Sequence, residues 1–300
     1  MFELHPVTLA DKQWIDPIVL AEDCPSADYC FGSIYLWDEK YRQLVGRLGE
    51  RLICLPCYET APFFAWPIGR GDPVPVLDRM REYAAAQGFP FVLRGVTEEH
   101  LPLVRALWGD GCAVTAEREL WDYLYSAEKL DTLSGKHLHG KRNHIHRFEQ
   151  EYHWRFEPVT PRNIPACRAM LDRWMDLCGE EDQDGIDDEY RAIQRAFASF
   201  GALDLDGGLL WAGTEPVAFS IGEMIAGNTF DTHFEKAYAH VNGAYPMINR
   251  QFARYIRTIH PQVRWINRED DTGRPSLRQS KLSYRPEKMV EKYKVVLPNE

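Results

Sequence analysis

The 300-residue sequence lacks several features that would assign it to a class at once. No apolar run approaches the roughly 20 residues that a membrane-spanning helix needs, so we expect no transmembrane segment. The first residues carry acids early and lack a basic stretch followed by an apolar block, which argues against a secretory signal. Seven scattered cysteines, an odd number, suit reduced thiols better than a disulfide framework, and we therefore expect a cytoplasmic protein.

An excess of positive charge is also missing, because 45 acidic residues outnumber 35 basic ones and the formal net charge is −10. This balance disfavours binding of nucleic acid or an anionic membrane over the whole surface, but it leaves a local basic groove open. Apolar residues make up 45% of the chain and charged residues 27%, which is ordinary for a globular protein. The length suffices for one large domain or two medium ones.

The order of predicted elements indicates two α/β units in sequence, at residues 1–125 and 126–300. Each unit runs through helices, antiparallel-looking strands, a helix, a short strand, another helix and a final strand, without a repeat at residue level. Apolar periodicity predicts helices over 33–48, about 136–152 and 163–179. The fold class that we expect is α+β, an α/β sandwich with two mixed sheets and flanking helices, and with most of the chemistry in the second unit.

Cys54 and Cys57 form a CLPC motif with the spacing of thioredoxin-like redox sites. Redox use requires the first cysteine at a helix N-terminus, which lowers the pKa of its thiol. The motif instead lies in a strand-like run that Pro56 ends, so we expect buried structural thiols.

A first basic segment, KHLHGKRNHIHR at 136–147, contains four cationic residues, four histidines and no acid. On a helix its residues Leu138 and Ile145 share a face with Phe148, and Lys141 falls inside that apolar stripe. A lysine there must snorkel, pair with an acid or contact a ligand, and a solvated basic helix with one snorkelling lysine is the alternative. The histidines do not predict a zinc site, because H-x-H on a helix points the two rings apart. We expect no structural metal.

A second basic segment follows a polar strand end. Asn267, Arg268 and Glu269 come after the strand RWIN, where ligands commonly bind in α/β sheets. On the next helix, basic residues recur at helical spacing: Arg278, Lys281 and Arg285. A charged helix with salt bridges to the preceding acids is the alternative. We expect this helix and the segment 136–147 to form two walls of one anion-holding cleft.

A glycine-containing turn between a strand and a helix is a third candidate for ligand binding. Gly243 and Ala244 lie in this turn, after the strand that carries Glu235. Such a turn exposes backbone N–H groups that favour a phosphate, although an ordinary loop before a helix explains the same residues.

Several blocks of sequence carry a family resemblance: DYLYSAEKLDTLSGKHLHGKRNHIHRFEQEY, VAFSIGE, THFEKAYAHVNGAYPMIN, INREDDTGRPSLRQSKLSYRP and, in the first half, FGSIYLWDEKY. In this order they resemble the DUF2156 family, which is similar to the C-terminal domain of bacterial phosphatidylglycerol lysyltransferases. The resemblance spans nearly the whole chain. It implies a tandem acetyltransferase-like (GNAT) fold, and the transfer of an aminoacyl group from tRNA to an amine or hydroxyl acceptor.

The predicted site combines proton transfer with charge stabilisation. Glu235 is the expected general base and Glu269 the second candidate, Tyr284 would protonate the leaving group, and His233 is a further proton carrier. The backbone of Gly243 and Ala244 would stabilise an oxyanion. The residues expected to bind the donor or its anionic groups are Lys141, Arg142, Asn143, Gly243, Ala244, Asn267, Arg268, Arg278, Lys281 and Arg285.

Three hypotheses of function remain open at this point. The leading one is an aminoacyl or acyl transferase, with the tRNA 3′ end as a partner and a small molecule, a peptide or a lipid headgroup as the acceptor. The second is an acyl-CoA-dependent N-acyltransferase. The third is a non-catalytic binding module with a basic cleft. We expect no tightly bound cofactor, because the donor substrate, aminoacyl-tRNA or acyl-CoA, would supply the transferred group.

Overall fold

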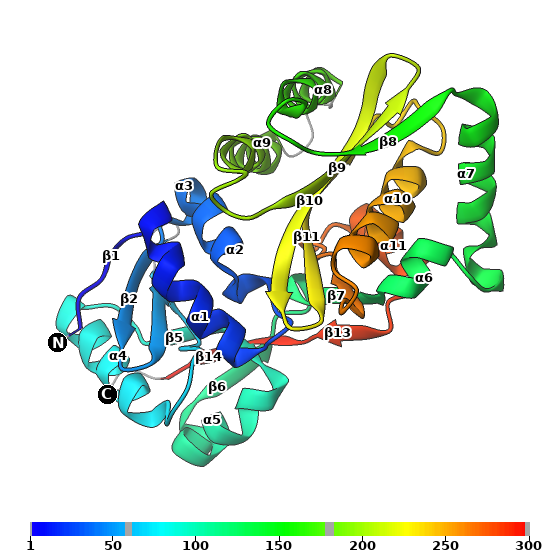
Figure 1. The fold of residues 1–300 in the computed structure, drawn as a ribbon. Coiled ribbons are helices and arrows are strands. Elements are labelled where there is room, and N and C mark those ends of the chain that lie inside the picture. Colours follow the sequence, from blue (N-terminus) through cyan, green and yellow to red (C-terminus); the bar gives the residue numbers. More distant parts are fainter. Residues whose placement is uncertain (1, 58–61, 178–182, 298–300) are drawn as a thin grey trace. The chain divides into compact units, whose positions relative to one another are not determined.

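The computed structural model describes residues 2–57, 62–177 and 183–297 (Figure 1). The chain divides into two compact units. The first consists of Met1–Asp122, Asp270–Arg274 and Met289–Glu300, and the second of Tyr123–Glu269 and Pro275–Lys288. The chain enters the second unit at Tyr123, and two later segments belong to the first unit.

The first unit contains two small sheets, with strand orders β1-β2-β3 and β4-β5-β14-β6. β14, from the end of the chain, pairs antiparallel with both β5 and β6. The strands are β1 (His5–Pro6), β2 (Leu44–Leu48), β3 (Arg51–Leu55), β4 (Phe64–Ala65), β5 (Val92–Thr97), β6 (Ala113–Ala116) and β14 (Lys292–Val296). The helices are α1 (Lys12–Glu22), α2 (Phe31–Leu36), α3 (Asp38–Tyr41), α4 (Val74–Gln87) and α5 (Leu101–Trp108).

The helix predicted over 33–48 is wrong in its second half. α3 ends at Tyr41, and Arg42 takes a left-handed backbone conformation with φ 47°. The following residues form β2, which pairs antiparallel with β3 through a turn that contains Gly49. Val45 of β2 and Cys54 of β3 are partners in this hairpin, and both are buried. Pairing and burial therefore outweigh the helical propensity of the segment.

The prediction of buried structural thiols in the CLPC motif is confirmed for its first cysteine. Cys54 is buried in β3, and burial raises the pKa of its thiol to about 12. Cys57 is half-buried just after the strand, and both thiols are free. A thiol that stays protonated at neutral pH is a poor nucleophile, so Cys54 serves packing.

The second unit is built on a seven-stranded sheet with the order β13-β7-β12-β11-β10-β9-β8. β11 and β12 pair in parallel, and β11, β10, β9 and β8 pair antiparallel in succession. The strands are β7 (Asp122–Ser126), β8 (Trp154–Pro158), β9 (Asp206–Ala212), β10 (Glu215–Ala226), β11 (Thr229–Ala237), β12 (Trp265–Asn267) and β13 (Lys288–Val290).

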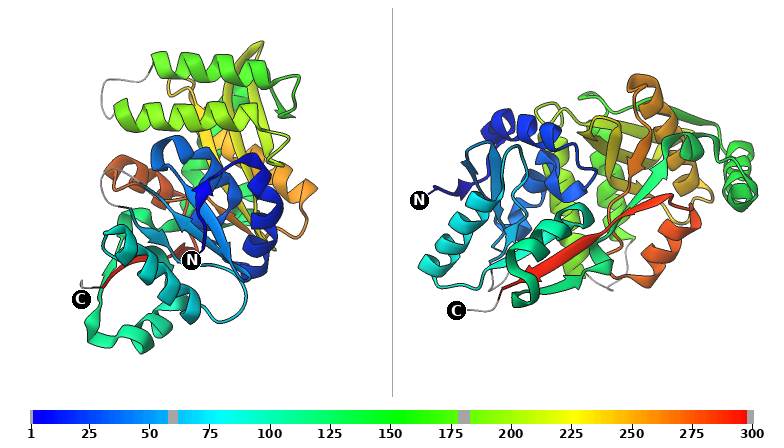
Figure 2. Two further views of the ribbon diagram at one scale, coloured as in Figure 1. Left: turned by 90° about the vertical axis from the view of Figure 1, so that its left-hand side faces the viewer. Right: turned by 90° about the horizontal axis from the view of Figure 1, so that it is seen from below.

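Helices pack on this sheet from several segments of the chain. α8 and α9 lie side by side (Figure 2), and α10 packs along β9, β10 and β11. The helices are α6 (Ala127–Thr132), α7 (His139–Glu151), α8 (Ile164–Asp176), α9 (Gln183–Ala198), α10 (Ala244–Ile259) and α11 (Pro275–Ser283). The prediction over 136–152 matches α7 and a short 3-10 turn before it. The end of the helix predicted over 163–179 lies outside the described residues.

The side-chain pattern of β11 requires an irregularity in the strand. Phe230 faces α10, because its ring centroid lies 5.6 Å from that of Phe252. Glu235 also faces α10, because Asn249 Nδ2 donates a hydrogen bond to its Oε2 at 3.0 Å. In a regular strand, residues five apart point to opposite faces of the sheet.

A β-bulge at His233 provides this irregularity. The register between β10 and β11 shifts between Ile221 and Gly222, and His233 is the extra residue on β11 at that point. Before the bulge, Asp231 points away from α10, and after it Glu235 points toward α10. The two ends of one strand thus supply acids to two different polar clusters.

Candidate active site

The loop after β12 directs two adjacent side chains to opposite faces of β11. Asn267 Oδ1 accepts a hydrogen bond from the backbone N–H of Glu269 at 2.7 Å, and Glu269 has a left-handed backbone with φ 54°. From α11, Lys281 Nζ donates a hydrogen bond to the carbonyl oxygen of Arg268. These contacts fix the turn. As a result, Arg268 lies next to Glu235, the acid after the bulge, and Glu269 lies next to His233 and Asp231, the residues at and before the bulge.

The first cluster centres on the carboxylate of Glu235. Arg268 Nη2 lies 2.9 Å from Oε1, and Asn249 Nδ2 donates to Oε2. The side chains of Arg268 and Glu235 are only 12% and 10% exposed. The carboxylate is therefore oriented at both oxygens, in surroundings where charges interact more strongly than they do in water.

The ring of Tyr284 brings a second cation to this cluster. Lys141 Nζ lies 4.0 Å from the ring centroid, and Arg268 Cζ lies 4.9 Å from it. Burial raises the pKa of Tyr284 far above its usual range, although Arg268 lowers it, so the hydroxyl stays protonated at neutral pH. Burial lowers the pKa of Lys141 and Arg268 lowers it further, whereas Glu235 raises it. Two cations and one carboxylate leave a net positive charge, which can hold an anion.

Gly243 allows α7 to pack closely against the start of α10. Gly243 has φ 83°, and a Cβ atom there would lie 2.4 Å from the carbonyl oxygen of His144. Next to it, His144 Nδ1 lies 3.2 Å from Asn242 Oδ1. Lys141 precedes His144 by about one helical turn, so this close approach positions the lysine over Tyr284.

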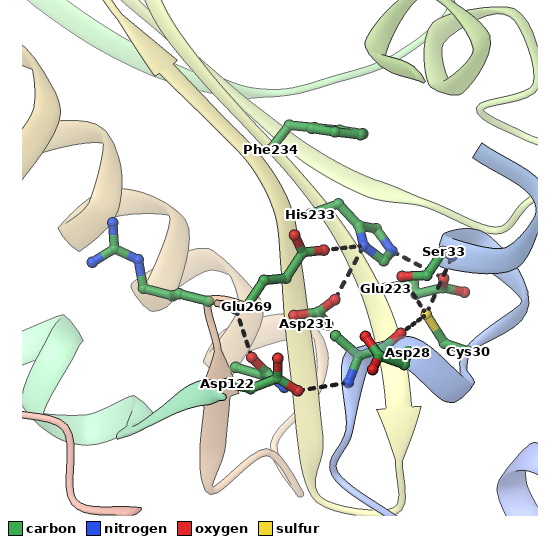
Figure 3. A network of polar contacts seen from close by, with 12 residues as sticks. Asp28, Cys30, Ser33, Asp122, Glu223, Asp231, His233, Phe234 and Glu269 are labelled. Carbon is green, nitrogen blue, oxygen red and sulfur yellow. Dashed lines mark hydrogen bonds and ion pairs between the residues drawn. The ribbon is translucent and has the colours of Figure 1, made fainter. Parts of the chain in front are cut away.

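The second cluster surrounds the imidazole of His233 (Figure 3). Nδ1 lies 3.0 Å from Asp231 Oδ2 and 3.0 Å from Glu269 Oε1, and Nε2 lies 3.0 Å from Glu223 Oε1. The side chains of His233 and Asp231 are fully buried. Burial raises the pKa of Glu269 to about 7, Asp231 raises it too, and His233 lowers it. Three acids therefore converge on one ring.

Four of the residues predicted for the site come together: Lys141, Glu235, Arg268 and Tyr284. The contact of Lys141 with Tyr284 also joins the two basic segments that we expected to face each other. Both segments lie in the second unit. The catalytic and binding roles assigned to these residues stay predictions.

Other residues of the predicted set have different surroundings. Arg142 donates to two backbone carbonyl groups in the turn before α7 and so caps that turn. Asn143 is exposed and lies 3.2 Å from His139 Nε2. Arg285 is exposed after α11 with φ 59°, and Arg278 is half-buried on α11. None of these contacts joins the Glu235 carboxylate.

Three further residues of the predicted set already make hydrogen bonds within the chain. The N–H of Ala244 donates to Val241 O at 3.1 Å, and its predicted role toward an oxyanion stays a prediction. Asn267 and Lys281, predicted to bind an anion, hold the loop after β12. These two contacts help to keep Arg268 in place.

Sequence reasoning missed several residues of the two clusters. Asn249 is a polar residue on the buried face of α10, where its neighbours Met247 and Phe252 are apolar, and this contrast was available in the sequence. Asp231 and Glu223 are acids inside two apolar strands, which is a similar signal. Strand alternation would still have placed Asp231 on the face of Glu235, because the bulge leaves no clear trace in the sequence.

Two α/β units with mixed sheets define the class as a tandem acyltransferase fold of the GNAT type. A tandem GNAT protein from the clavulanic acid biosynthesis pathway matches it with a TM-score of 0.52, at 11% identity over 100% of both chains. The chain belongs to the family described as phosphatidylglycerol lysyltransferase, C-terminal, whose model matches residues 24–296.

Other solved structures agree with this assignment. A conserved protein of unknown function from Bacteroides thetaiotaomicron is similar with a TM-score of 0.94, at 33% identity over 99% of this chain and 100% of that one. The C-terminal DUF2156 domain of a protein named as a lysylphosphatidylglycerol synthetase from Agrobacterium fabrum has a TM-score of 0.65, at 14% identity over 97% and 93% of the two chains. The latter similarity concerns the fold.

One curated relative matches over part of its length. The uncharacterized protein MYCGA3080 from Mycoplasmoides gallisepticum is 28% identical over 181 residues, which are 58% of this chain and 55% of that protein. The chain thus spans about half the length of this relative. Among the described residues, no helix combines the length and the apolar character that crossing a bilayer requires.

Proposed function

We propose that the second unit transfers an aminoacyl group from aminoacyl-tRNA to an amine or hydroxyl acceptor. The family is named after an enzyme that moves lysine to phosphatidylglycerol, which supports this class of reaction. The observation that carries the proposal is the cluster of Glu235, Arg268, Lys141 and Tyr284, in which an oriented carboxylate, two cations and a protonated phenol lie together. These are the groups that acyl transfer from an ester needs.

Each group has one task in the proposed reaction. Glu235 accepts the proton that the attacking nitrogen or oxygen of the acceptor loses as its bond to the carbonyl carbon forms. Lys141 and Arg268 stabilise the negative charge that develops on the carbonyl oxygen or that the donor carries on its phosphates. The ester bond to the ribose then breaks, the ribose oxygen takes a proton from Tyr284, and the proton that Glu235 accepted returns to the Tyr284 phenolate.

The donor side of the site has the charge that a nucleic acid end requires. The chain is acidic as a whole, so binding of tRNA must depend on local cations. α7 supplies two of them, because Arg147 is exposed on this helix and Lys141 lies at its inner side. A tRNA 3′ end that reaches Lys141 would therefore pass a basic helix.

A transfer assay with defined donors tests this function. The purified protein is incubated with tRNA charged with labelled amino acids, or with labelled acyl-CoA, and with phosphatidylglycerol vesicles, peptides or small amines as acceptors. We expect label to move from aminoacyl-tRNA to one acceptor class, and Glu235→Gln to slow this transfer by about 100-fold or more while the donor still binds.

Two outcomes would reject the proposal. Transfer from acyl-CoA but not from tRNA would assign the site to an N-acyltransferase. Binding of charged tRNA without transfer to any acceptor, and without release of the amino acid, would identify a non-catalytic module. Glu149→Gln, an exposed acid of α7 that pairs with Arg250, is the matched control and should leave the rate unchanged.

A further inference from the structure

The cluster around His233 has the composition and the geometry of a metal site. Asp231, His233 and Glu269 each offer one ligand atom, and the three atoms lie within 4.8 Å of one another. They come from β11 and from the turn after β12, which Asn267 fixes. The ligand set is therefore carried by β11 and by the short turn directly after β12, its parallel partner strand, and such positions are held more rigidly than positions in a long loop.

Two of the spacings between the ligand atoms match neighbouring positions of a coordination octahedron. Ligands at about 2.1 Å from one ion and at right angles to each other are about 3.0 Å apart. His233 Nδ1 lies at that distance from both Asp231 Oδ2 and Glu269 Oε1. A single N–H on Nδ1 can donate a well-aligned hydrogen bond to only one of these two oxygens. A metal ion could bind both oxygens at once, so it would satisfy them more completely.

The other nitrogen of the ring has the partner that a metal-bound histidine needs. His233 Nε2 lies 3.0 Å from Glu223 Oε1, and both side chains are buried. A ligating histidine almost always donates its second N–H to a carboxylate, a carbonyl group or water, which fixes the tautomer and the ring orientation. Glu223 would therefore hold the proton on Nε2 and leave the lone pair of Nδ1 for the ion.

The charge of the cluster also favours a cation. Three acids, Asp231, Glu223 and Glu269, surround one imidazole, and Lys281 lies near Glu269 as a further cation. Burying carboxylate groups is costly, and a divalent ion would offset part of that cost. Glu269 is 23% exposed, whereas the other two ligands are fully buried, so its side is the route by which an ion would enter.

We propose that Asp231, His233 and Glu269 bind one divalent transition-metal ion, with Mn²⁺ and Zn²⁺ as the probes. One imidazole and two carboxylates suit both ions. Three protein ligands leave coordination positions open for water or for a substrate oxygen. The proposal is independent of the aminoacyl transfer, and it concerns a different place from the histidines of α7, whose spacing does not predict zinc.

Titration with Mn²⁺ tests the site directly. The protein is treated with EDTA, desalted and titrated with MnCl₂, and the loss of the free Mn²⁺ signal is followed by electron paramagnetic resonance. We expect one ion bound per chain, and displacement of that ion by one equivalent of ZnCl₂. Glu269→Gln, which keeps the size of the side chain at the more exposed ligand, should weaken binding at least tenfold. Glu223→Gln should also weaken it by about 10- to 100-fold.

A single histidine–carboxylate pair provides the matched control. His260 Nε2 lies 2.6 Å from Asp206 Oδ2. Asp206→Asn should leave binding unchanged, and circular dichroism and thermal melting verify that each variant is folded. The proposal is overturned if neither ion binds to the folded protein, if Glu269→Gln binds Mn²⁺ as the unaltered chain does, or if binding follows Asp206. Binding of a small amine such as lysinamide in place of a metal would also overturn it, because it would assign the acids to an ammonium group.

Discussion

Lys141 shows how much one residue can reveal about a site before the fold is known. Its place in the apolar stripe of a helix left three options, and the structure places its ammonium group over the ring of Tyr284 with Arg268 on the same ring. The site thus holds two cations in contact with one aromatic ring. Burial already lowers the pKa of Lys141, so the protein pays a cost in stability to keep it there.

A variant of Lys141 distinguishes an effect on donor binding from an effect on the stability of the fold. Lys141→Met keeps most of the stem that packs in the apolar stripe but removes the ammonium group. We expect the affinity for aminoacyl-tRNA to fall by about tenfold, with a smaller salt dependence, and the thermal midpoint to stay equal or to rise. Filter binding at several salt concentrations measures the first effect, and calorimetry the second.

Arg147→Met is the control for this experiment, because Arg147 is an exposed cation on the same helix. A general electrostatic effect would weaken binding equally in both variants. Equal losses, or an unchanged affinity in Lys141→Met, would remove Lys141 from the donor site.

At the scale of elements, the packing of α7 on the start of α10 depends on Gly243. We expect Gly243→Ala to destabilise the protein by about 2 kcal/mol or more, because the residue has a positive φ and its Cβ would collide with the carbonyl oxygen of His144. The shift of α7 would also move Lys141. Chemical denaturation gives the free energy of unfolding, and tRNA binding reports the displaced lysine.

A second glycine separates the two causes of this loss. Gly213, in the turn between β9 and β10, has φ 61° but no atom within 4 Å of a Cβ at that position. Gly213→Ala should therefore cost only the backbone strain, about 1 kcal/mol, and leave tRNA binding intact. If both variants lose the same stability, the contact with α7 contributes nothing.

The elements were largely predictable from the sequence, whereas their irregularities were not. Apolar periodicity located α7, and the strand end before Arg268 was identified by its density of polar residues. The hairpin of β2 and β3 was missed because its first strand reads as a helix until its partner is known. The bulge at His233 was missed for a similar reason, since an extra residue in one strand is defined only by the register with the other.

At the scale of the whole molecule, the path of the chain makes the first unit depend on the last strand. β14 is an inner strand of the sheet β4-β5-β14-β6, and its Lys292 lies 2.8 Å from both Asp28 and Asp122. Sequence order suggested two contiguous units, because local patterns do not reveal that a terminal strand returns to an earlier sheet. The lysine side chain is 1% exposed, so it is an internal ion partner of the first unit.

We expect Lys292→Met to destabilise the protein by about 3 to 5 kcal/mol at neutral pH, because it leaves the buried carboxylate of Asp122 without its cation. The loss should depend on pH. Burial raises the pKa of Asp122 from 3.8 to about 6, against the opposing effect of Lys292, so removal of the lysine raises it further. A carboxyl whose pKa is higher in the folded state stabilises the fold when protonated, and this contribution falls as the pH rises from about 4 through the folded pKa.

The difference in unfolding free energy between Lys292→Met and the unaltered chain should therefore be smaller at pH 5 than at pH 8, as measured by urea denaturation at both values. Lys294→Met, a half-buried lysine on the same strand, should show a small loss without this dependence. A loss in Lys292→Met that is equal at both pH values would mean that Asp122 does not take up a proton when its partner is gone. The contribution of Lys292 would then lie in packing along β14, and the charge pair would be incidental to the stability of the first unit.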